Sequence, residues 1–476
     1  MIPDRLRSVL LEDVMSLSRL FHDRGHDLYL VGGSVRDALL DRKFTEPSDL
    51  DFTTGARPDE ILDITQPWAH SSYLAGKDFG TIGLVRDGER YEITTFRSEV
   101  YRDDSRKPVV TFSDDIAEDL SRRDFTVNAM ALKVPSSPGD LPEMIDPFDG
   151  LVDLVSQKLR TPAGPEVSFG DDPLRMLRLF RFMSTLGFEP TTRALAAVTE
   201  MKGRLAIISP ERIRTELDKL LVGEFVVEAL EALVESGLAD EFIPEIPALA
   251  VEQDPVHRHK DVLAHSIAVV GKTEPRLTLR LAALFHDIGK PATREFDGGG
   301  VTFHHHEVVG ARMVRKRMKA LRYPKGTTED VSQLVFLHMR PHTFKMGWTD
   351  SAVRRYVRDA GPLLDDLNNL VRSDVTTANK RRARTISNRI DDLEERIAVL
   401  SAQEQLDSLR APIDGNDVME YLGMEPGREV GTIMKMLLEH RIEDGPYTPE
   451  EAYRLLDAWR SGRQPSAVSR QPEDMS

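Results

Sequence analysis

The sequence contains no cysteine. Disulfides and thiolate metal sites are therefore excluded, and the composition fits a reducing compartment, so we expect a cytoplasmic protein. No stretch approaches the roughly 18 apolar residues that a membrane-spanning helix requires. Residues 1–20 also lack the uninterrupted apolar segment of a signal peptide. We therefore expect neither a membrane span nor a membrane partner.

An excess of basic charge is missing as well, because the formal net charge is −16. This balance argues against adhesion to nucleic acid over the whole surface, although nucleic acid in a locally basic groove stays open. With 476 residues, of which 40% are hydrophobic, the chain is too long for one compact core. No internal repeat is visible.

The order of hydrophobic patterns predicts an α+β chain, with short strands first and helices afterwards. A polar segment at 99–108 predicts a mobile loop, and a proline-containing segment at 244–255 predicts a linker. Apolar residues in 4-3-4-3 spacing between 386 and 400 predict a helix packed on its own body. The predicted boundaries are a head at 1–165, a helical neck at 166–250, a helical body at 251–380, a helical tail at 381–462 and disorder at 463–476.

The first candidate site follows the apolar run at 28–31. Gly32 and Gly33 end this predicted strand and let the backbone approach a ligand closely. Ser34 caps the helix that follows, whose free N–H groups favour a phosphate. Arg36 adds a charged fork, so this turn predicts a phosphate site.

Acidic residues on the next strands complete this candidate site. Asp49 and Asp51 are two residues apart in a predicted strand, so both side chains point the same way. Two adjacent carboxylates repel each other unless a cation lies between them, and Mg²⁺ prefers oxygen ligands and phosphate partners. An adjacent strand would bring Glu92 beside the pair. The pattern predicts metal-assisted transfer at a phosphate.

These motifs, together with four later ones, carry a family resemblance. Gly32-Gly33-Ser34-x-Arg36-Asp37 with Asp49-x-Asp51 resembles the signature of polymerase-β-type nucleotidyltransferases. The later motifs resemble those of the tRNA nucleotidyltransferase and poly(A) polymerase family, in order across about 190 residues. They are Arg122-Arg123-Asp124, Asp146-Pro147-Phe148-Asp149-Gly150, Asp171-Asp172-Pro173-Leu174-Arg175 and Ser209-Pro210-Glu211-Arg212-Ile213. The chain thus resembles the class II, bacterial-type CCA-adding enzymes.

The resemblance implies roles for individual residues of these motifs. Asp49 and Asp51 would hold Mg²⁺, Gly33 and Arg36 would contact the nucleotide's phosphates, and Arg123 would contact the nucleotide with Asp124 near its ribose. Asp171 stands where the family commonly has Glu, a change that keeps the charge. A segment around Arg97, Glu99, Tyr101, Asp103 and Arg106 resembles the family's flexible loop and favours complete CCA addition over CC addition.

The fourth motif suggests how bases are selected. Arg175, Arg178 and Arg181 recur every third residue on a predicted helix, and Asp172 precedes Arg175 by about one turn. An aspartate accepts from an exocyclic amine and an arginine donates to a ring acceptor. Cytosine and adenine offer this pattern on their pairing edge, whereas uracil and guanine do not. Asp172 with Arg175 would therefore select C and A without a template.

A second candidate site lies in the predicted body. His286-Asp287 follows an apolar run, and further histidines and an aspartate lie upstream and downstream. Imidazole and carboxylate groups together suit a divalent metal. The set resembles the HD superfamily of metal-dependent phosphohydrolases, and this resemblance favours His306 over His304 and His305. The six candidate ligands are His265, His286, Asp287, His306, His338 and Asp374.

The resemblance implies a polymerase-β-like nucleotidyltransferase head followed by an all-α neck, an HD body and a tail. It implies CCA addition to the 3′ end of tRNA from CTP and ATP with Mg²⁺, with a second divalent metal and phosphohydrolase activity in the HD domain. The alternatives are a poly(A) polymerase, an HD phosphohydrolase whose head only binds RNA, and a non-catalytic RNA-binding protein. The sequence leaves the oligomeric state open.

Overall fold

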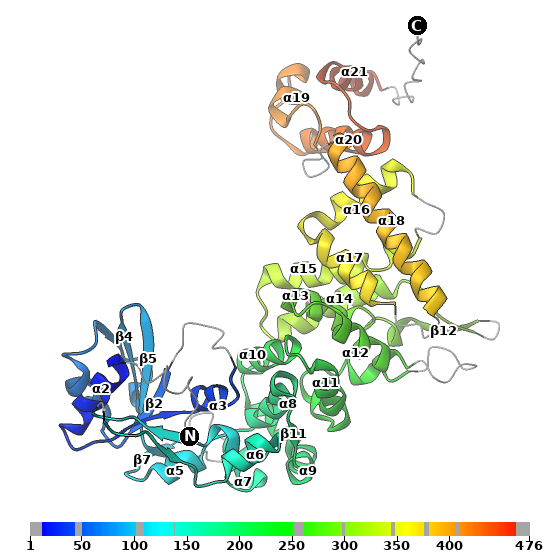
Figure 1. The fold of residues 1–476 in the computed structure, drawn as a ribbon. Coiled ribbons are helices and arrows are strands. Elements are labelled where there is room, and N and C mark those ends of the chain that lie inside the picture. The colour runs from blue at the N-terminus through cyan, green and yellow to red at the C-terminus, as the bar shows by residue number, and fades with distance from the viewer. Residues whose placement is uncertain are drawn as a thin grey trace.

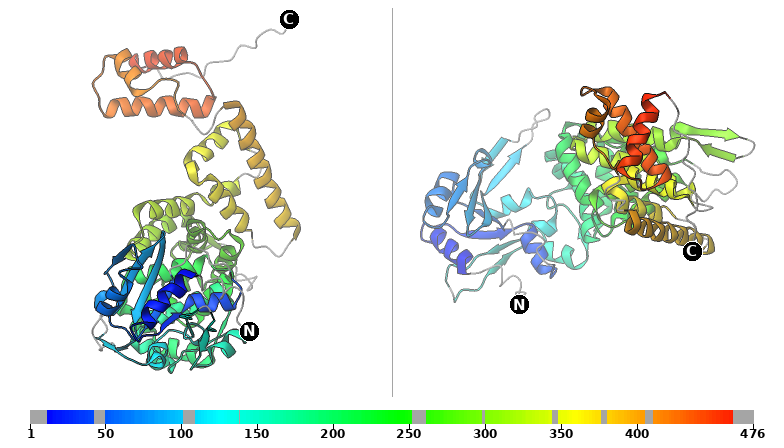
Figure 2. Two further views of the ribbon diagram at one scale, coloured as in Figure 1. Left: turned by 60° about the vertical axis from the view of Figure 1, so that its left-hand side comes forward. Right: turned by 90° about the horizontal axis from the view of Figure 1, so that it is seen from above.

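The computed structural model describes residues 12–42, 50–100, 109–137, 139–251, 261–297, 300–343, 348–375, 380–404 and 410–462. A strand-rich head comes first, and helical layers follow it in chain order to the C-terminal tail (Figure 1, Figure 2). The α+β class is therefore confirmed. Among the described helices, none has the length and apolarity to cross a bilayer.

The head is built on a seven-stranded mixed sheet in the order β3-β4-β5-β2-β1-β8-β9. β2 and β5 run parallel, while the other neighbours are antiparallel. The strands are β1 (Leu28–Val31), β2 (Leu50–Thr54), β3 (Ser71–Tyr73), β4 (Thr81–Arg86), β5 (Glu89–Thr95), β8 (Ala131–Lys133) and β9 (Glu143–Ile145). The strand predicted at 28–31, the strand predicted to carry Asp51 and the adjacent strand predicted to carry Glu92 are thus confirmed.

Short helices and a separate hairpin complete the head. They are α2 (Glu12–His22), α3 (Gly33–Leu39), α4 (Pro58–Thr65), α5 (Ile116–Ser121), α6 (Gly150–Val155), α7 (Pro165–Asp171) and the pair β6 (Arg97–Val100) and β7 (Val109–Phe112). The hairpin partly corrects the loop predicted at 99–108, because Glu99 and Val100 pair with Val110 and Val109. Residues 101–108 lie outside the described residues, and so does the tail predicted to be disordered at 463–476.

Four helices form the region after the head: α8 (Leu174–Leu186), α9 (Thr192–Met201), α10 (Pro210–Leu221) and α11 (Val226–Glu235). The predicted linker at 244–255 is wrong in its first part. Ile246 and Leu249 are fully buried in the core, since the apolar residues between the prolines still pack. Residues 252–260 lie outside the described part of the chain.

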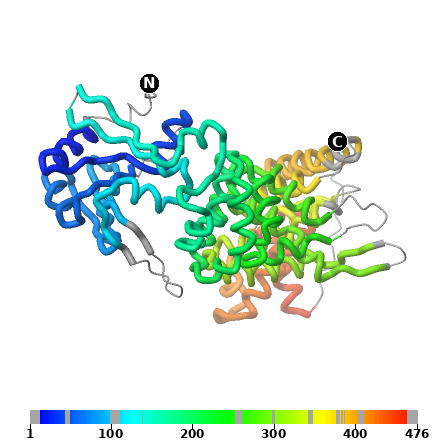
Figure 3. Tube along the Cα trace, turned by 90° about the horizontal axis from the view of Figure 1, so that it is seen from below, coloured from blue at the N-terminus to red at the C-terminus, as the bar shows by residue number. Residues whose placement is uncertain are grey.

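The remaining elements are helical apart from one hairpin. They are α12 (Val262–Lys272), α13 (Leu277–Phe285), β12 (Arg294–Asp297), β13 (Gly300–Phe303), α14 (His306–Ala320), α15 (Lys325–Leu337), α16 (Asp350–Ala360), α17 (Leu364–Ser373), α18 (Lys380–Glu404), α19 (Gly415–Leu422), α20 (Arg428–Asp444) and α21 (Pro449–Arg460). Ile390, Leu393 and Leu400 of α18 are buried, which confirms the helix packed on its own body. Figure 3 shows the β12–β13 hairpin projecting from the helices.

The described residues form three hydrophobic clusters of unequal size, of which the smallest lies in the head around Val31 and Leu120. One continuous cluster extends from Val14 in the head to Leu400 in α18. A second, smaller cluster joins α19, α20 and α21 alone. The head, the following helices and the histidine-containing helices therefore share one core, which holds both candidate sites in place.

Candidate functional sites

The glycine turn after β1 lets two charged side chains come close to the backbone. Gly32 has a φ of 74°, a conformation that strongly favours glycine. A Cβ at Gly32 would lie 3.1 Å from Nη1 of Arg123 and 3.8 Å from Oδ2 of Asp51. The turn, the arginine and the carboxylate predicted separately from the sequence therefore meet at one point.

The β2–β5 pairing brings a second carboxylate to this point. Asp51 is exposed between the buried residues Leu50 and Phe52, and its partner across the parallel pair is Glu92. Residues paired in register point to the same face of a sheet. The Tyr73 hydroxyl donates to Oε1 of Glu92 at 3.1 Å. Asp49 lies outside the described residues, so its place beside Asp51 stays a prediction.

Arg36, which the resemblance implies contacts the nucleotide's phosphates, has protein partners in this structure. Its side chain is buried, and it donates to both carboxylate oxygens of Asp37 at 2.8 Å and to Oδ1 of Asn128 at 2.6 Å. The guanidinium also lies 5.2 Å from the Phe182 ring centroid. Arg36 therefore stabilises the glycine turn through its hydrogen bonds with Asp37 and Asn128. The prediction that Ser34 caps this helix is wrong, because α3 begins at Gly33 with Gly32 at its N-cap and no side-chain cap, and Ser34 is buried inside the helix.

Arg123 is positioned by a residue that the sequence reasoning missed. Asp119 on α5 is fully buried and holds Arg122 at 2.7 Å and Arg123 at 3.4 Å. Burial raises the pKa of Asp119, but the charges of Arg122 and Arg123 outweigh it and hold that pKa below its usual value. The i, i+4 spacing of Asp119 and Arg123 was the available signal.

Arg178 and Arg181 are not on a solvated helix face. Arg178 donates from Nε and Nη2 to Oδ2 of Asp124, at 2.8 and 2.5 Å. Arg181 pairs with the buried Glu216 and lies 3.8 Å from the Phe182 ring centroid. These contacts tie the head motif to α8 and α10. Asp124 thus serves a head-to-helix junction in this structure.

Asp172 and Arg175 each have other partners in this structure. Asp172 is in extended backbone between α7 and α8 and accepts from Nη2 of Arg212 at 2.8 Å. Arg175 is buried and donates to Oγ of Ser168 at 3.0 Å and to the Arg122 carbonyl. In this structure the Asp172 carboxylate therefore already holds a cation, beside the edge with which the resemblance implies that it contacts a base. The sequence reasoning missed this role of Arg212.

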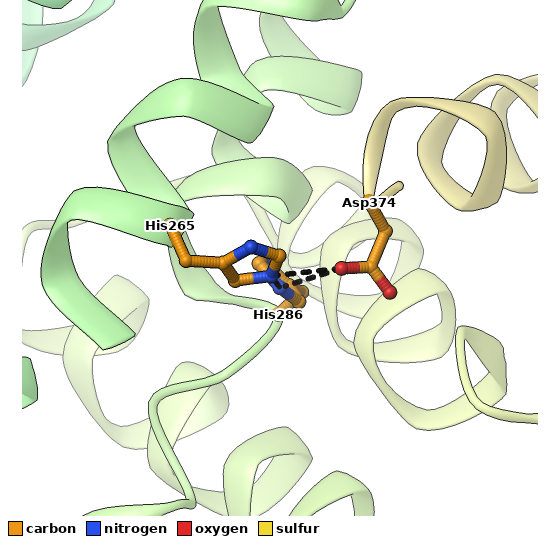
Figure 4. A group of neighbouring side chains, drawn as sticks. All are labelled: His265, His286 and Asp374. Carbon is orange, nitrogen blue, oxygen red and sulfur yellow. Dashed lines mark hydrogen bonds and ion pairs between the residues drawn. The ribbon is translucent and has the colours of Figure 1, made fainter. Parts of the chain in front are cut away.

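The rear site brings all six candidate ligands together. Their donor atoms form two adjoining groups of three, in each of which the atoms lie within 4.8 Å of one another. The first group is His265, His286 and Asp374 (Figure 4), and the second is Asp287, His306 and His338. Nε2 of His286 is 3.1 Å from Oδ2 of Asp287, and Nε2 of His306 is 3.5 Å from Oδ1 of the same carboxylate. Asp287 therefore joins the two groups.

The backbone orients three of these imidazoles. Nδ1 of His286, His306 and His338 each lies within 2.9 Å of a carbonyl oxygen three residues earlier. A carbonyl can only accept, so each Nδ1 carries a proton and each Nε2 is the ring nitrogen that faces the cluster. His304 and His305 are exposed, and only His306 of this run enters the cluster.

The electrostatics of the rear cluster favour a bound cation. Burial disfavours a protonated His286, but the Asp287 and Asp374 carboxylates outweigh it and raise the pKa of His286 to about 10. Burial and the nearby His286 charge lower the pKa of His338 to about 3. Two carboxylates and four imidazoles form a donor set that fits divalent metals. The two carboxylates and four imidazoles of the cluster therefore fit a divalent metal ion.

A mixed-sheet head with this turn and a helical domain with this cluster are the parts of a nucleotidyltransferase that carries an HD domain. Three family models match in that order. They are "Poly A polymerase head domain" at 28–160, "Probable RNA and SrmB- binding site of polymerase A" at 187–249 and "HD domain" at 262–389.

Curated relatives match between about half and nearly all of the chain. The A-adding tRNA nucleotidyltransferase of Deinococcus radiodurans is 33% identical over 71% of this chain and 78% of its own. The CC-adding tRNA nucleotidyltransferase of Thermus thermophilus is 31% identical over 93% of this chain and 95% of its own. The CCA-adding enzyme of Bacillus licheniformis is 41% identical over 48% of this chain and 54% of its own. The chain belongs to the class II CCA-adding tRNA nucleotidyltransferase family and adds nucleotides to tRNA 3′ ends.

Solved structures share the fold. A structure of the Bacillus stearothermophilus CCA-adding enzyme in complex with CTP matches with a TM-score of 0.67 at 23% identity, over 95% of this chain and 98% of that one. A Thermotoga maritima CCA-adding enzyme complexed with tRNA matches with a TM-score of 0.56 at 17% identity, over 94% of both chains. The order of head and helical domains is common to them.

Proposed function

We propose that this protein adds the complete CCA sequence to tRNA, using CTP and then ATP. The observation that carries the nucleotidyl-transfer chemistry is the meeting of Asp51 and Arg123 at the Gly32 turn, with Glu92 paired to Asp51 across β2 and β5. Asp51 and Glu92, with Asp49, are the ligands and catalytic acids. Arg123, held by Asp119, is placed to bind the triphosphate with Gly33 and Ser34. We assign the reaction to the cytoplasm.

The head residues fit a divalent cation, because the exposed Asp51 and the half-buried Glu92 lie on one face of two neighbouring strands. Mg²⁺ bound there would promote attack of the tRNA 3′ hydroxyl on the α-phosphate and stabilise the leaving pyrophosphate. The protein's own task is to hold both phosphate and hydroxyl in line. Arg123, which lies beside Asp51 at the Gly32 turn, would neutralise part of the triphosphate charge.

Base selection follows from Asp172, Arg175 and Arg212 in this proposal. The Asp172 carboxylate accepts the exocyclic amine of C or A once Arg212 releases it, and Arg175 donates to the ring acceptor. Arg212 is about half exposed, so releasing it into water costs little. Arg178 and Arg181 hold the neighbouring part of α8 in place through their ion pairs with Asp124 and Glu216. The predicted divisions at 1–165, 166–250, 251–380 and 381–462 are proposed as head, neck, HD body and tail.

The test uses three tRNA substrates, ending before CCA, after C and after CC, each with one labelled nucleotide at a time. The proposal expects two C additions, then one A, and no further growth. Long A tracts on arbitrary RNA would instead identify a poly(A) polymerase. Asp49→Ala with Asp51→Ala should abolish all addition, and persistent incorporation would reject the carboxylate assignment.

A partial reaction is the second candidate, because relatives covering most of the chain are named A-adding and CC-adding. An A-adding enzyme would extend only the tRNA that ends in CC. A CC-adding enzyme would extend the two shorter tRNAs with CTP and never use ATP. The resemblance of 97–106 to the family's flexible loop supports the complete reaction, although 101–108 lie outside the described residues.

We also propose that the HD domain is a metal-dependent phosphohydrolase. Asp287 offers one oxygen to each group of ligands, so the six residues would be suited to hold two divalent ions. Such ions would supply an activated water for a phosphate ester. His265 and Asp374 are the partly exposed members and mark the side from which a substrate enters.

The HD proposal is tested by metal content and phosphate release. His286→Ala should lose the bound metal and any hydrolysis of phosphate esters while sparing nucleotide addition. His305→Ala is the matched control, because His305 is exposed and outside the cluster. Metal content that is unchanged in His286→Ala would contradict the site. Retained metal without hydrolysis in the wild type would contradict only the activity.

A further inference from the structure

The HD domain carries a strongly basic segment in an acidic chain. Between Val308 and Thr328 the sequence has seven basic residues and no acidic one, while the whole chain has a net charge of −16. The segment covers most of α14 and the turn before α15. Its basic residues are Arg312, Arg315, Lys316, Arg317, Lys319, Arg322 and Lys325.

Four of these residues form a continuous exposed stripe. The α14 stripe consists of Arg312, Arg315, Lys316 and Lys319, all exposed and spaced i, i+3, i+4 and i+7. That spacing places them on one face of the helix. Val314 and Met318, on the other face, are fully buried. The charges are therefore gathered in one row.

The row is not balanced by carboxylates. Within the described residues, no member of the α14 stripe forms an ion pair with an acid, whereas the inward-facing Arg317 pairs with Glu245 at 2.8 Å. Like charges three and four residues apart on a helix repel and destabilise it slightly. A bound polyanion would relieve this repulsion.

The α14 stripe lies between the two candidate sites. α14 begins at His306, a member of the rear cluster, and its 15 residues span about 22 Å. At its other end, Arg214 of α10 donates to the Arg322 carbonyl, and Tyr323 donates to Asp218 of α10. α10 also carries Arg212, the partner of Asp172. Figure 1 shows α10 directly beside this part of the HD domain.

We propose that the α14 stripe binds the phosphate backbone of the tRNA acceptor arm. The proposal rests on tRNA as the substrate and adds the surface that holds it. A duplex arm lying along α14 would keep its 3′ end near the Asp172–Arg212 pair. Four cations in a row match a polyanionic backbone better than a folded protein, whose surface carries both signs of charge.

The test measures the tRNA dissociation constant at several salt concentrations, without nucleotide. The variant replaces the four residues of the α14 stripe by Gln, which keeps helix propensity. Affinity near physiological salt should fall at least about tenfold. The slope of log affinity against log salt should become shallower by about two to four, because each lost phosphate contact removes up to ~0.9.

The matched control replaces four exposed arginines scattered over the head, neck and tail, namely Arg24, Arg90, Arg193 and Arg454, by Gln. It changes the net charge equally and should lower the affinity far less. Lys316→Arg with Lys319→Arg should keep wild-type binding. An unchanged slope in the stripe variant, or an equal loss in the control, would overturn the α14 stripe. Wild-type protein that binds no tRNA would instead reject the proposed function as well.

Discussion

The junction between Asp124 and Arg178 makes the sharpest stability prediction. Asp124 is 8% exposed and receives two hydrogen bonds from Arg178, one from the Asn128 amide and one from the Phe125 N–H. Asp124→Asn keeps the shape and removes the charge, which leaves a largely buried guanidinium without its main partner. Removing one partner of a buried pair costs about 3–5 kcal/mol.

The expected cost is smaller here, because Arg178 is 33% exposed and keeps Glu216 at 3.5 Å. We therefore expect Asp124→Asn to lower the free energy of unfolding by roughly 2–3 kcal/mol. Urea unfolding measures it, with Asp114→Asn as control. Asp114 pairs with Arg57 but its side chain is 88% exposed, so its loss should cost under about 0.5 kcal/mol. A cost below about 1 kcal/mol for Asp124→Asn would refute the argument.

The same pair predicts a pH dependence. Burial raises the pKa of Asp124, but the charge of Arg178 and the hydrogen bonds from Asn128 and Arg178 outweigh it, so its pKa lies well below the usual value. A carboxyl with a depressed folded-state pKa stabilises the fold above its unfolded pKa of about 3.9. That stability is lost as the pH falls further. The difference between wild type and Asp124→Asn should therefore be constant from pH 7 to 5 and shrink below about pH 4.

Three further predictions concern the candidate sites. Asp51→Ala alone should lower nucleotide addition by more than about 100-fold without changing the melting temperature, measured by single-turnover incorporation, and near-normal rates would contradict its role. Gly289→Ala should lower the metal content of the HD domain and reduce the free energy of unfolding by about 1–3 kcal/mol, because its Cβ would lie 2.1 Å from the His306 carbonyl oxygen. Gly326→Ala is the control and should change neither quantity, because its Cβ would meet no atom within 4 Å. Asp172→Asn should weaken the preference for CTP and ATP over UTP and GTP at least about tenfold, and unchanged selectivity would show that another group reads the base.

Asp172 and Arg175, which we propose select the nucleotide, have other partners in this structure. The sequence motif pairs Asp172 with Arg175, yet Asp172 holds Arg212 and Arg175 holds main-chain oxygens. An ion pair that occupies Asp172 keeps its carboxylate satisfied until an amine replaces the guanidinium. We therefore expect Arg212→Gln to change the KM for CTP and ATP more than the rate of the bound complex, and equal effects on both would contradict this exchange.

Local features of the fold and sites were predictable from the sequence alone. The strands before the glycine turn and the packed helix at 386–400 follow from residue periodicity, which depends only on neighbours along the chain. The six HD ligands were predicted from their types and family resemblance, and the structure brings all of them together. His286 and Asp287 are neighbours in the sequence, whereas His265 and Asp374 join them only through the packing of helices that lie far apart along the chain.

Only the tertiary structure decided which charged groups meet across the chain. Asp51 faces Glu92 because β2 pairs with β5 in one particular register, and a shift by one residue would turn one carboxylate away. Arg36 is buried because its guanidinium forms hydrogen bonds with Asp37 and with Asn128, which is 92 positions away in the sequence. Arg212 reaches Asp172 across 40 positions of sequence. Residue types thus determined the chemistry that this chain can perform, whereas strand register and helix packing determined which residues stand together, because those contacts depend on groups far apart along the chain.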